Sequence, residues 1–175
     1  MIETMHIEDI REECEKEKFI KLHRQLWWRI AKDIALKWSF LKVHSIFESH
    51  IDWDVVMELK EYYSRVLSRK NIMNNCFACE YASQVKKKIY NYNNEKYYLS
   101  LCQFCPFFWD SNKTKTSCCT DTDIYEDETK YDMLYKLFPI ETDEDMKKVI
   151  KMCCRIAELP VNDELVDVNG VFFKC

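Results

Sequence analysis

Apolar residues recur every three or four positions along several stretches of the chain, which is the spacing of amphipathic helices. The longest such stretch covers residues 15–38, and a second long one covers residues 142–159. The same spacing predicts a helix over residues 52–67, with Asp52 as its N-cap, and a short helix over residues 129–138. A mainly helical fold is therefore expected.

Between the helices over residues 52–67 and 129–138 the helical spacing gives way to polar, aromatic and cysteine-bearing segments. A strand is predicted over residues 96–104, where aromatic and polar positions alternate, and a small hairpin is predicted around Asn169–Gly170. The other expected elements are helices over residues 7–14, 40–48 and 80–89, a turn over residues 90–95 and a surface loop over residues 110–127.

The composition is that of one globular domain. The chain has 175 residues, of which 47% are hydrophobic and 32% charged, enough apolar material to bury a core. The first 18 residues carry many charged side chains where a signal peptide would have an apolar segment, and no apolar run is long enough to span a membrane. Ten cysteines without an export signal predict a reducing compartment, so we expect a cytoplasmic protein.

Two features of the sequence argue against an enzyme. The only glycine is Gly170, whereas loops that bind phosphate groups need glycines so that the backbone can approach the ligand. The four histidines, His6, His23, His44 and His50, form no HExxH motif and no recognisable cysteine–histidine signature. We predict a protein without catalytic residues, in which His23 belongs to the core or its boundary.

Four cysteines form the clearest motif: Cys76-x2-Cys79 and, after 22 intervening residues, Cys102-x2-Cys105. Two residues between thiolates let both sulfurs face one ion, and two such pairs complete a tetrahedral zinc site. An iron–sulfur cluster uses the same four ligands and remains the alternative cofactor. Zinc (Zn²⁺) is the predicted cofactor, and its role would be structural, because four thiolates leave no open position for a substrate.

The zinc prediction defines the expected domain organisation. We expect a single domain over residues 1–175, mainly α with a small β/zinc-knuckle insert (α+β) at residues 68–110. The adjacent Cys118 and Cys119 leave the ligand set open, since either could replace one of the four cysteines. Cys153 and Cys154 lie within a helical pattern, and we expect them to be buried as small apolar residues.

Charge is distributed unevenly along the chain. Residues 120–145 contain ten acidic side chains and two lysines, a local net charge of −8 in a chain whose net charge is −4. Such a run is either a solvated face or a surface for a basic partner, such as a protein channel that holds nucleic acid. The basic cluster Lys86–Lys88 keeps a second hypothesis open, in which a zinc ribbon binds nucleic acid or assists transcription.

The two cysteine segments read Asn75-Cys76-Phe77-Ala78-Cys79-Glu80-Tyr81-Ala82 and Cys102-x-x-Cys105-Pro106 with Trp109. They resemble a group of small zinc-knuckle proteins encoded by bacteriophages and prophages. Two flanking pieces, His23-Arg24-Gln25-Leu26-Trp27 and Ile156-Ala157-Glu158-Leu159-Pro160, are similar to the group's N-terminal and C-terminal helices. The chain departs from the group in Phe107, where a leucine is common, and in its doubled Cys118-Cys119.

The resemblance implies zinc binding and an anti-defence function. The chain looks like an anti-CRISPR protein that acts in the bacterial host cell on a type II CRISPR effector nuclease, whose guide–target channel is basic. The implied mechanism is occupation of that basic surface by an acidic one, so that target DNA cannot load, with no direct contact to nucleic acid or membrane. The candidate partner contacts are Asp121, Asp123, Glu126, Asp127 and Glu128.

Overall fold

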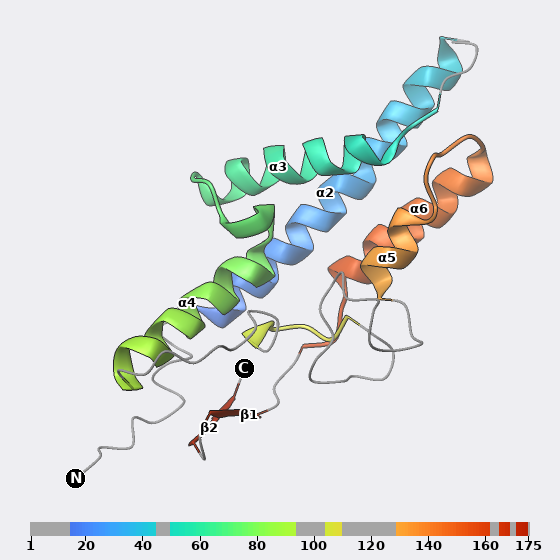
Figure 1. Ribbon diagram of the computed structural model, residues 1–175. Helices are drawn as coiled ribbons and strands as arrows, with labels where there is room; N and C mark the ends of the chain where they lie inside the picture. Colours follow the sequence, from blue (N-terminus) through green and yellow to red (C-terminus); the bar gives the residue numbers. More distant parts are fainter. Residues whose placement is uncertain are drawn as a thin grey trace.

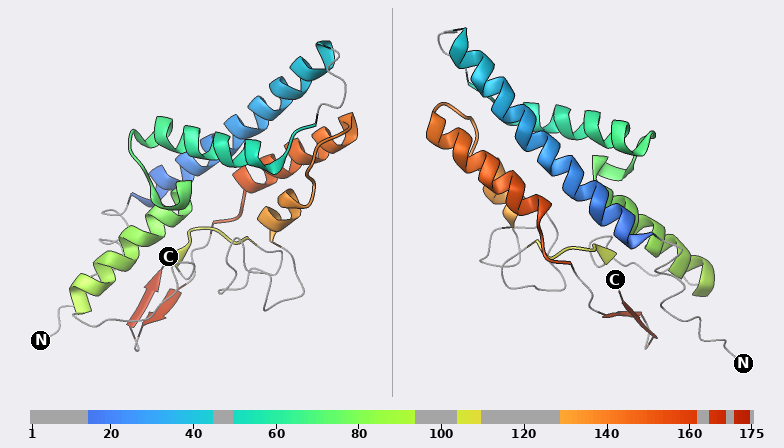
Figure 2. Two further views of the ribbon diagram at one scale, coloured as in Figure 1. Left: turned by 45° about the horizontal axis from the view of Figure 1, so that its top comes forward. Right: turned by 180° about the vertical axis from the view of Figure 1, so that it is seen from behind.

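A long helix, α2 (Lys16–Val43), forms the axis of the fold (Figure 1). A computed structural model of the protein describes residues 15–44, 50–93, 104–109, 129–161, 165–168 and 171–174. The helix α6 (Asp143–Ala157) packs along α2, which also contacts α3 (Trp53–Ser68) and α4 (Phe77–Asn93). The short helix α5 (Lys130–Tyr135) packs on α6, and the right-hand view of Figure 2 shows α3 and α6 on different sides of α2.

The four helices predicted first from the apolar spacing are all present, and the mainly helical fold class is confirmed for the described residues. Two boundaries were wrong. Because α2 continues to Val43, residues 40–43 do not begin a separate helix, and residues 45–49 of that prediction lie outside the described part. Because α4 continues to Asn93, residues 90–93 are helical and not a turn. Both errors arose because the boundaries were predicted from the preferences of single residues. These preferences contribute less free energy than the backbone hydrogen bonds that extend an existing helix.

Several predicted elements fall on residues that the structure does not describe. They are the helix over residues 7–14, most of the strand over residues 96–104 and the loop over residues 110–127. The described part of the predicted insert contains the 3-10 helix η1 (Met73–Asn75) and α4, and its β character remains a prediction. No helix in the described ranges combines the length and the apolar composition needed to cross a membrane.

The predicted hairpin at residues 161–175 is present. Strands β1 (Leu165–Val168) and β2 (Val171–Lys174) pair in antiparallel register, with Val168 opposite Val171. Two residues, Asn169 and Gly170, connect the strands, which is the loop length and composition that favour a tight hairpin turn.

The core lies where α2 meets α6. Helix α2 buries Leu26, Ile30 and Ile34 completely, and α6 buries Val149 and Ile156 in the same cluster. Burial of one side chain of this size stabilises the fold by about 1.5–3 kcal/mol. These positions belong to the apolar stripes from which the two helices were predicted, so sequence spacing and packing agree here.

Threonines cap the two helices in the C-terminal part of the chain. The Asp145 N–H donates to Thr142 Oγ1 at 3.1 Å and the Thr142 N–H donates to Asp145 Oδ2 at 3.0 Å, a complete capping box at the start of α6. The Asp132 N–H donates to Thr129 Oγ1 at 3.2 Å at the start of α5. Asp52 occupies the N-cap position of α3, as predicted, but its side chain makes no capping hydrogen bond.

Two isolated β-bridges join segments that are far apart in the sequence. Ile51 and Ile140 exchange backbone hydrogen bonds of 3.1 and 2.9 Å, which tie the start of α3 to the segment that leads into α6. Phe107 pairs with Val161, and the Phe108 N–H donates to the Pro160 carbonyl at 3.0 Å. The second bridge fixes residues 104–109, which carry one of the candidate cysteine ligands, beside the C-terminal end of α6.

Candidate metal centre

The first candidate cysteine pair lies at the start of α4. Cys76 immediately precedes the helix, and Cys79 lies in its first turn. The backbone N–H groups of Ala78 and Cys79 donate to the Cys76 sulfur, and the Cys79 side chain is hydrogen-bonded to it as well. The structure therefore brings these two candidate ligands together, in the arrangement that lets both sulfurs face one ion.

The Cys76 thiol is acidic for a buried group. The hydrogen bond with the Cys79 side chain lowers its pKa, burial raises it, and the Lys60 charge and the two N–H groups lower it further, to about 6. Helix N-termini and nearby lysines lower the pKa of thiols in this way. The thiolate, which is the form that binds a metal, is thus available at neutral pH.

Lys60 is a buried lysine near this pair. It lies on α3, is only 8% exposed, and its Nζ is 5.2 Å from the centre of the Tyr131 ring. Its charge lowers the pKa of both Cys76 and His23. A zinc ion with four thiolate ligands carries a net negative charge, which a buried ammonium group would partly offset. Lys60 was not among the predicted site residues, although its spacing of four residues from Val56 placed it on the inward face of α3.

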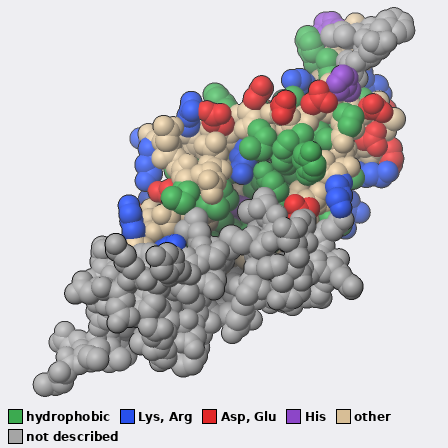
Figure 3. All heavy atoms as spheres, in the orientation of Figure 1, with side chains coloured by type: hydrophobic (Ala, Val, Ile, Leu, Met, Phe, Trp, Pro, Cys, Tyr) green, Lys and Arg blue, Asp and Glu red, His purple; other side chains and the backbone are tan. Residues whose placement is uncertain are grey.

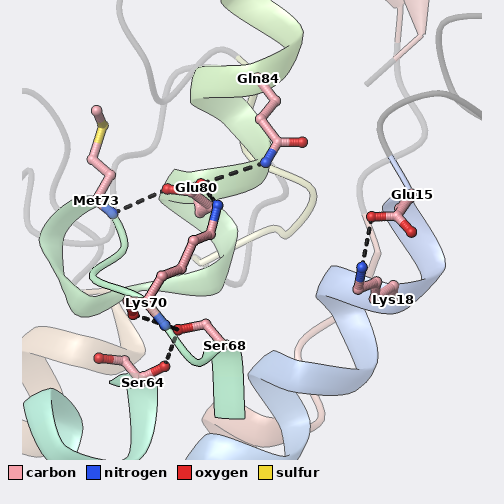
Figure 4. Close-up of polar contacts among 8 residues, drawn as sticks. All are labelled: Glu15, Lys18, Ser64, Ser68, Lys70, Met73, Glu80 and Gln84. Atoms are coloured by element: carbon pink, nitrogen blue, oxygen red, sulfur yellow. Dashed lines mark hydrogen bonds and ion pairs between the residues drawn. The ribbon is translucent and has the colours of Figure 1, made fainter. Parts of the chain in front are cut away.

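Glu80 holds the loop before the cysteine pair against α4 (Figure 4). Its carboxylate accepts hydrogen bonds from the Met73 N–H at 3.1 Å, from Lys70 Nζ at 3.1 Å and from Gln84 Nε2 at 3.4 Å. Burial disfavours the ionised carboxylate, but the Met73 and Lys70 hydrogen bonds prevail and hold the pKa of Glu80 below its usual value. These contacts fix the loop relative to the helix on which Cys79 lies.

Two asparagines make the sharp turn that leads into Cys76. Asn74 and Asn75 have φ angles of 53° and 49°, in the left-handed region that asparagine tolerates better than most residues. The Ser64 hydroxyl on α3 donates to Asn75 Oδ1 at 3.3 Å. The turn directs the chain from α3 into α4 and sets the position of Cys76 at the N-terminus of α4.

Cys105 lies in a different segment, which is also well anchored. It is buried, and the indole Nε1–H of Trp109 donates to its sulfur at 3.3 Å. The Lys130 N–H donates to the Trp109 carbonyl at 3.2 Å, so this segment is tied to the start of α5 as well as to the end of α6. An N–H group on the sulfur stabilises a thiolate and is a suitable outer contact for a metal ligand.

The complete ligand set is not visible in the described residues. Cys102 lies outside them, as do Cys118 and Cys119, the two possible replacements. Among the residues that are described, no three His, Cys, Asp or Glu side chains gather closely enough to hold a metal ion. The structure thus brings Cys76 and Cys79 together but does not gather the buried Cys105 with them, and the zinc site remains a hypothesis.

His23 is a core histidine with one hydrogen bond. Its Nε2 is 2.9 Å from the Ile156 carbonyl oxygen, which can only accept, so this nitrogen carries the proton. Among the described residues, no group is hydrogen-bonded to its Nδ1. The ring packs on Phe107 at a centroid distance of 4.2 Å and on Trp109 at 5.9 Å. Burial lowers the pKa of His23 to about 4, so the ring is neutral at physiological pH.

The other cysteines with described side chains, Cys153 and Cys154, have thiols whose pKa is raised, whereas that of Cys76 is lowered. Cys153 is fully buried on α6, and burial raises the pKa of its thiol. Cys154 is half-buried, and burial again raises the pKa of its thiol, followed by the repulsion of Glu158. Cys153 is the small buried apolar residue that the helical pattern predicted, whereas Cys154 lies at the boundary between the core and solvent.

The structure describes the acidic run, residues 120–145, only from residue 129 onward. The candidate partner contacts, which lie outside the described part, are Asp121, Asp123, Glu126, Asp127 and Glu128. Asp132 and Asp145 take part in the caps of α5 and α6. Asp143 accepts hydrogen bonds from Trp38 Nε1 at 2.7 Å and from Lys42 Nζ at 2.5 Å. Part of the run therefore caps its own helices and links α6 to α2.

The geometry around Cys76 and Cys79 is compatible with two kinds of chemistry. Two cysteines at a helix N-terminus, one of them with a low pKa, also occur in dithiol oxidoreductases. Those enzymes need an accessible attacking sulfur, whereas Cys76 is only 6% exposed. Burial together with hydrogen bonds to the sulfur favours a structural metal ligand over a redox centre.

Comparison with known proteins gives no match: no family model, no curated protein and no solved structure is similar to this chain. The similarity to phage-encoded zinc-knuckle proteins therefore rests on the short segments quoted above. Function has to be inferred from the cysteine pair, its surroundings and the charge of the surface.

Proposed function

We propose that the chain is a zinc-stabilised anti-CRISPR protein, which binds a type II effector nuclease and prevents target DNA from loading. The cysteine pair at the start of α4 supports the zinc ion, because two sulfurs already lie side by side there. The net charge of −8 over residues 120–145 supports a basic partner, and the heteroduplex channel of such nucleases is positively charged. The protein acts by binding and has no catalytic residues of its own.

In this proposal Cys76, Cys79, Cys102 and Cys105 bind one Zn²⁺. The ion supplies folding free energy, since a closed set of thiolates offers no position to a substrate. Around it, Lys60 offsets negative charge and the Trp109 indole donates to the Cys105 sulfur. The zinc ion would tie the start of α4 to residues 104–109, two segments that are separate in the sequence.

Cobalt substitution tests the metal site. Co²⁺ bound by four thiolates gives intense thiolate-to-metal absorption bands, and we expect one equivalent per chain. Cys102→Ser should lose these bands or weaken metal binding at least tenfold, whereas Cys154→Ser, a change of the same chemistry outside the site, should retain both. An unchanged spectrum and stoichiometry in Cys102→Ser would reject the ligand set, and the same measurement on Cys118→Ser would show whether Cys118 is a ligand.

Charge reversal tests the inhibitor. We expect the wild-type chain to prevent DNA binding by a guide-loaded type II effector nuclease, and the Asp121→Lys, Asp123→Lys and Glu126→Lys triple variant to lose this effect. A control with Glu15→Lys and Glu17→Lys, which lie on exposed positions at the start of α2, should still inhibit. If the triple variant inhibits at the same concentration as the wild-type chain, the acidic run takes no part in the mechanism. No inhibition of any type II effector by the wild-type chain would reject the proposal itself.

The second hypothesis, a nucleic-acid-binding zinc ribbon, rests on the position of Lys86–Lys88. The three lysines lie on α4, about two turns after Cys79, and Lys87 is exposed. Basic side chains on a helix beside a metal knuckle can contact phosphate groups. Salt-sensitive binding of DNA or RNA that is lost in a Lys86→Glu, Lys87→Glu and Lys88→Glu variant would favour this function over the inhibitor.

A further inference from the structure

An aromatic patch lies where α3 and α5 meet. Tyr131, Tyr135 and Phe138 pack around the Trp53 ring at centroid distances of 5.5, 5.3 and 5.4 Å, with their planes steeply inclined to it. The Tyr131 hydroxyl reaches Met57 Sδ at 3.6 Å, so both helices contribute to one surface. We call these five residues the aromatic patch, and Figure 3 shows apolar side chains gathered on this face of the molecule.

The patch is open to solvent in the described part of the structure. Tyr135 is 57% exposed and Met57 is 41% exposed, while Trp53, Tyr131 and Phe138 are half-buried. Scattered exposed apolar residues are normal, but a contiguous group of tryptophan, tyrosine and methionine is typical of protein interfaces. Residues of these types also contribute most of the binding free energy where two proteins meet.

Acidic side chains flank the patch on α3. Asp54 lies three positions before Met57, on a neighbouring part of the helix surface, and Glu58 lies four positions after Asp54; both are exposed. Figure 3 shows a row of acidic side chains along one edge of the apolar group. A further acidic residue, Glu61, forms an ion pair with Arg65. We call Asp54 and Glu58 the acidic rim.

We propose that the aromatic patch and the acidic rim form a docking surface for a basic segment of a partner protein, which presents arginine or lysine beside apolar side chains. Cationic side chains interact favourably both with carboxylates and with the faces of tryptophan and tyrosine rings. The chain itself contains this contact, since the Arg29 guanidinium lies 5.5 Å from the centre of the Tyr63 ring. The inference rests on the proposed function in one respect, the basic partner, and adds the surface that the partner contacts.

Charge separates this partner from a second copy of the chain. In a two-fold contact the same surface is used on both subunits, so the acidic rim of one copy would lie close to that of the other. Like charges across an interface are unfavourable, whereas a basic segment complements the rim. A foreign basic partner therefore fits this surface better than self-association does.

A random peptide library tests the surface without any assumption about the partner. Displayed 16-residue peptides are selected on the immobilised wild-type chain and counter-selected on the Met57→Ser/Tyr135→Ser variant. We expect the surviving peptides to be enriched in arginine or lysine together with leucine or aromatic residues. Synthetic examples should bind the wild-type chain at least tenfold more tightly than this variant in calorimetry. The same peptides should bind the Asp54→Lys/Glu58→Lys variant at least tenfold more weakly than they bind the wild-type chain.

The matched control is Val66→Ser, an exposed apolar residue further along the same helix, which should leave peptide binding unchanged. Circular dichroism checks that every variant is folded before its affinity is measured. No enrichment, peptides without basic residues, or equal affinity for the patch and control variants would overturn the inference. Dimerisation of the wild-type chain that Met57→Ser/Tyr135→Ser abolishes would also overturn it. Because no nuclease takes part, a failure here is distinct from a failure of the inhibition assay.

Discussion

The α6 side of α2 and the cysteine-bearing side of the molecule bury different kinds of groups. Between α2 and α6 the buried residues are mainly aliphatic, such as Ile30 and Ile156, and the N-terminal end of α6 is satisfied by its own cap. On the cysteine-bearing side, the buried residues include Cys76 and Lys60. Burial of apolar groups is favourable by itself, whereas burial of thiolates and ammonium groups costs free energy unless partners offset it. The first side therefore needs no ligand, and the second gains most from a metal ion.

The largest expected effect is on the aliphatic side. Ile30→Ala should lower the free energy of unfolding by about 4 kcal/mol, because it removes buried methyl groups and leaves a cavity. Urea denaturation followed by circular dichroism should show the same loss with zinc and with a chelator. The control Leu36→Ala changes a residue of the same helix that is 58% exposed, and it should cost less than about 0.5 kcal/mol. A loss below about 1 kcal/mol for Ile30→Ala would show that this interface is not the main core.

His23 lies between the two sides and should make stability depend on pH. Burial depresses its pKa to about 4 in the folded state, below the ordinary value of 6.5, so the unfolded chain binds the proton more readily between these values. The free energy of unfolding should fall by up to about 3 kcal/mol as the pH drops from 6.5 to 4.

Denaturation at a series of pH values measures this dependence. His23→Gln should flatten it relative to wild type, and His44→Gln, at an exposed position, should not. Equal slopes for wild type and His23→Gln would contradict the assignment of this pH dependence to His23.

Lys60→Met should act mainly on the cysteine-bearing side. Removal of the charge near the thiolates should weaken zinc binding about tenfold, as is usual for residues that support metal ligands. In the metal-free protein the same change should be neutral or stabilising, because a buried ammonium group is replaced by an apolar side chain of similar length. Competition with a chromophoric chelator measures the first effect and urea denaturation the second. If Lys60→Met and the control Lys32→Met, at an exposed position, bind zinc equally well, Lys60 does not support the site.

The smallest effect belongs to the cap of α6. Thr142→Ala removes the hydroxyl that accepts the Asp145 N–H and should cost about 1 kcal/mol. The loss should be the same with and without zinc, since the cap belongs to the aliphatic side. Ser39→Ala, whose hydroxyl is exposed and bonds only within its own helix, serves as the control in the same thermal denaturation. A zinc-dependent loss for Thr142→Ala would show that the two sides are coupled.

The helices were predictable because their signals are local. Spacing of apolar residues identified α2 and α6. The cysteine spacing likewise identified Cys76 and Cys79 as neighbours, since only two residues separate them. These features need no knowledge of what lies opposite them in space.

The contacts of His23, of the aromatic patch and of Lys60 were not predictable, because they join residues that are distant in the sequence. The Ile156 carbonyl that bonds His23 lies 133 positions away in the sequence. The aromatic patch joins Met57 to Tyr131, which are 74 positions apart. Lys60 carried a local clue in its inward-facing spacing, but a lysine at such a position usually points to solvent, and its burial against Tyr131 became known only from the structure.

The pairing of α2 with α6 has a consequence for synthesis of the protein. About 100 residues separate the end of α2 from the start of α6, and the ribosome adds roughly 5–20 residues per second. For several seconds the inward face of α2, with Leu26 and Ile30, has left the ribosome without the helix that covers it. Contacts this distant in sequence also slow folding after release. The nascent chain therefore exposes this apolar face until α6 emerges, and in this interval α2 can already contact α3 and α4.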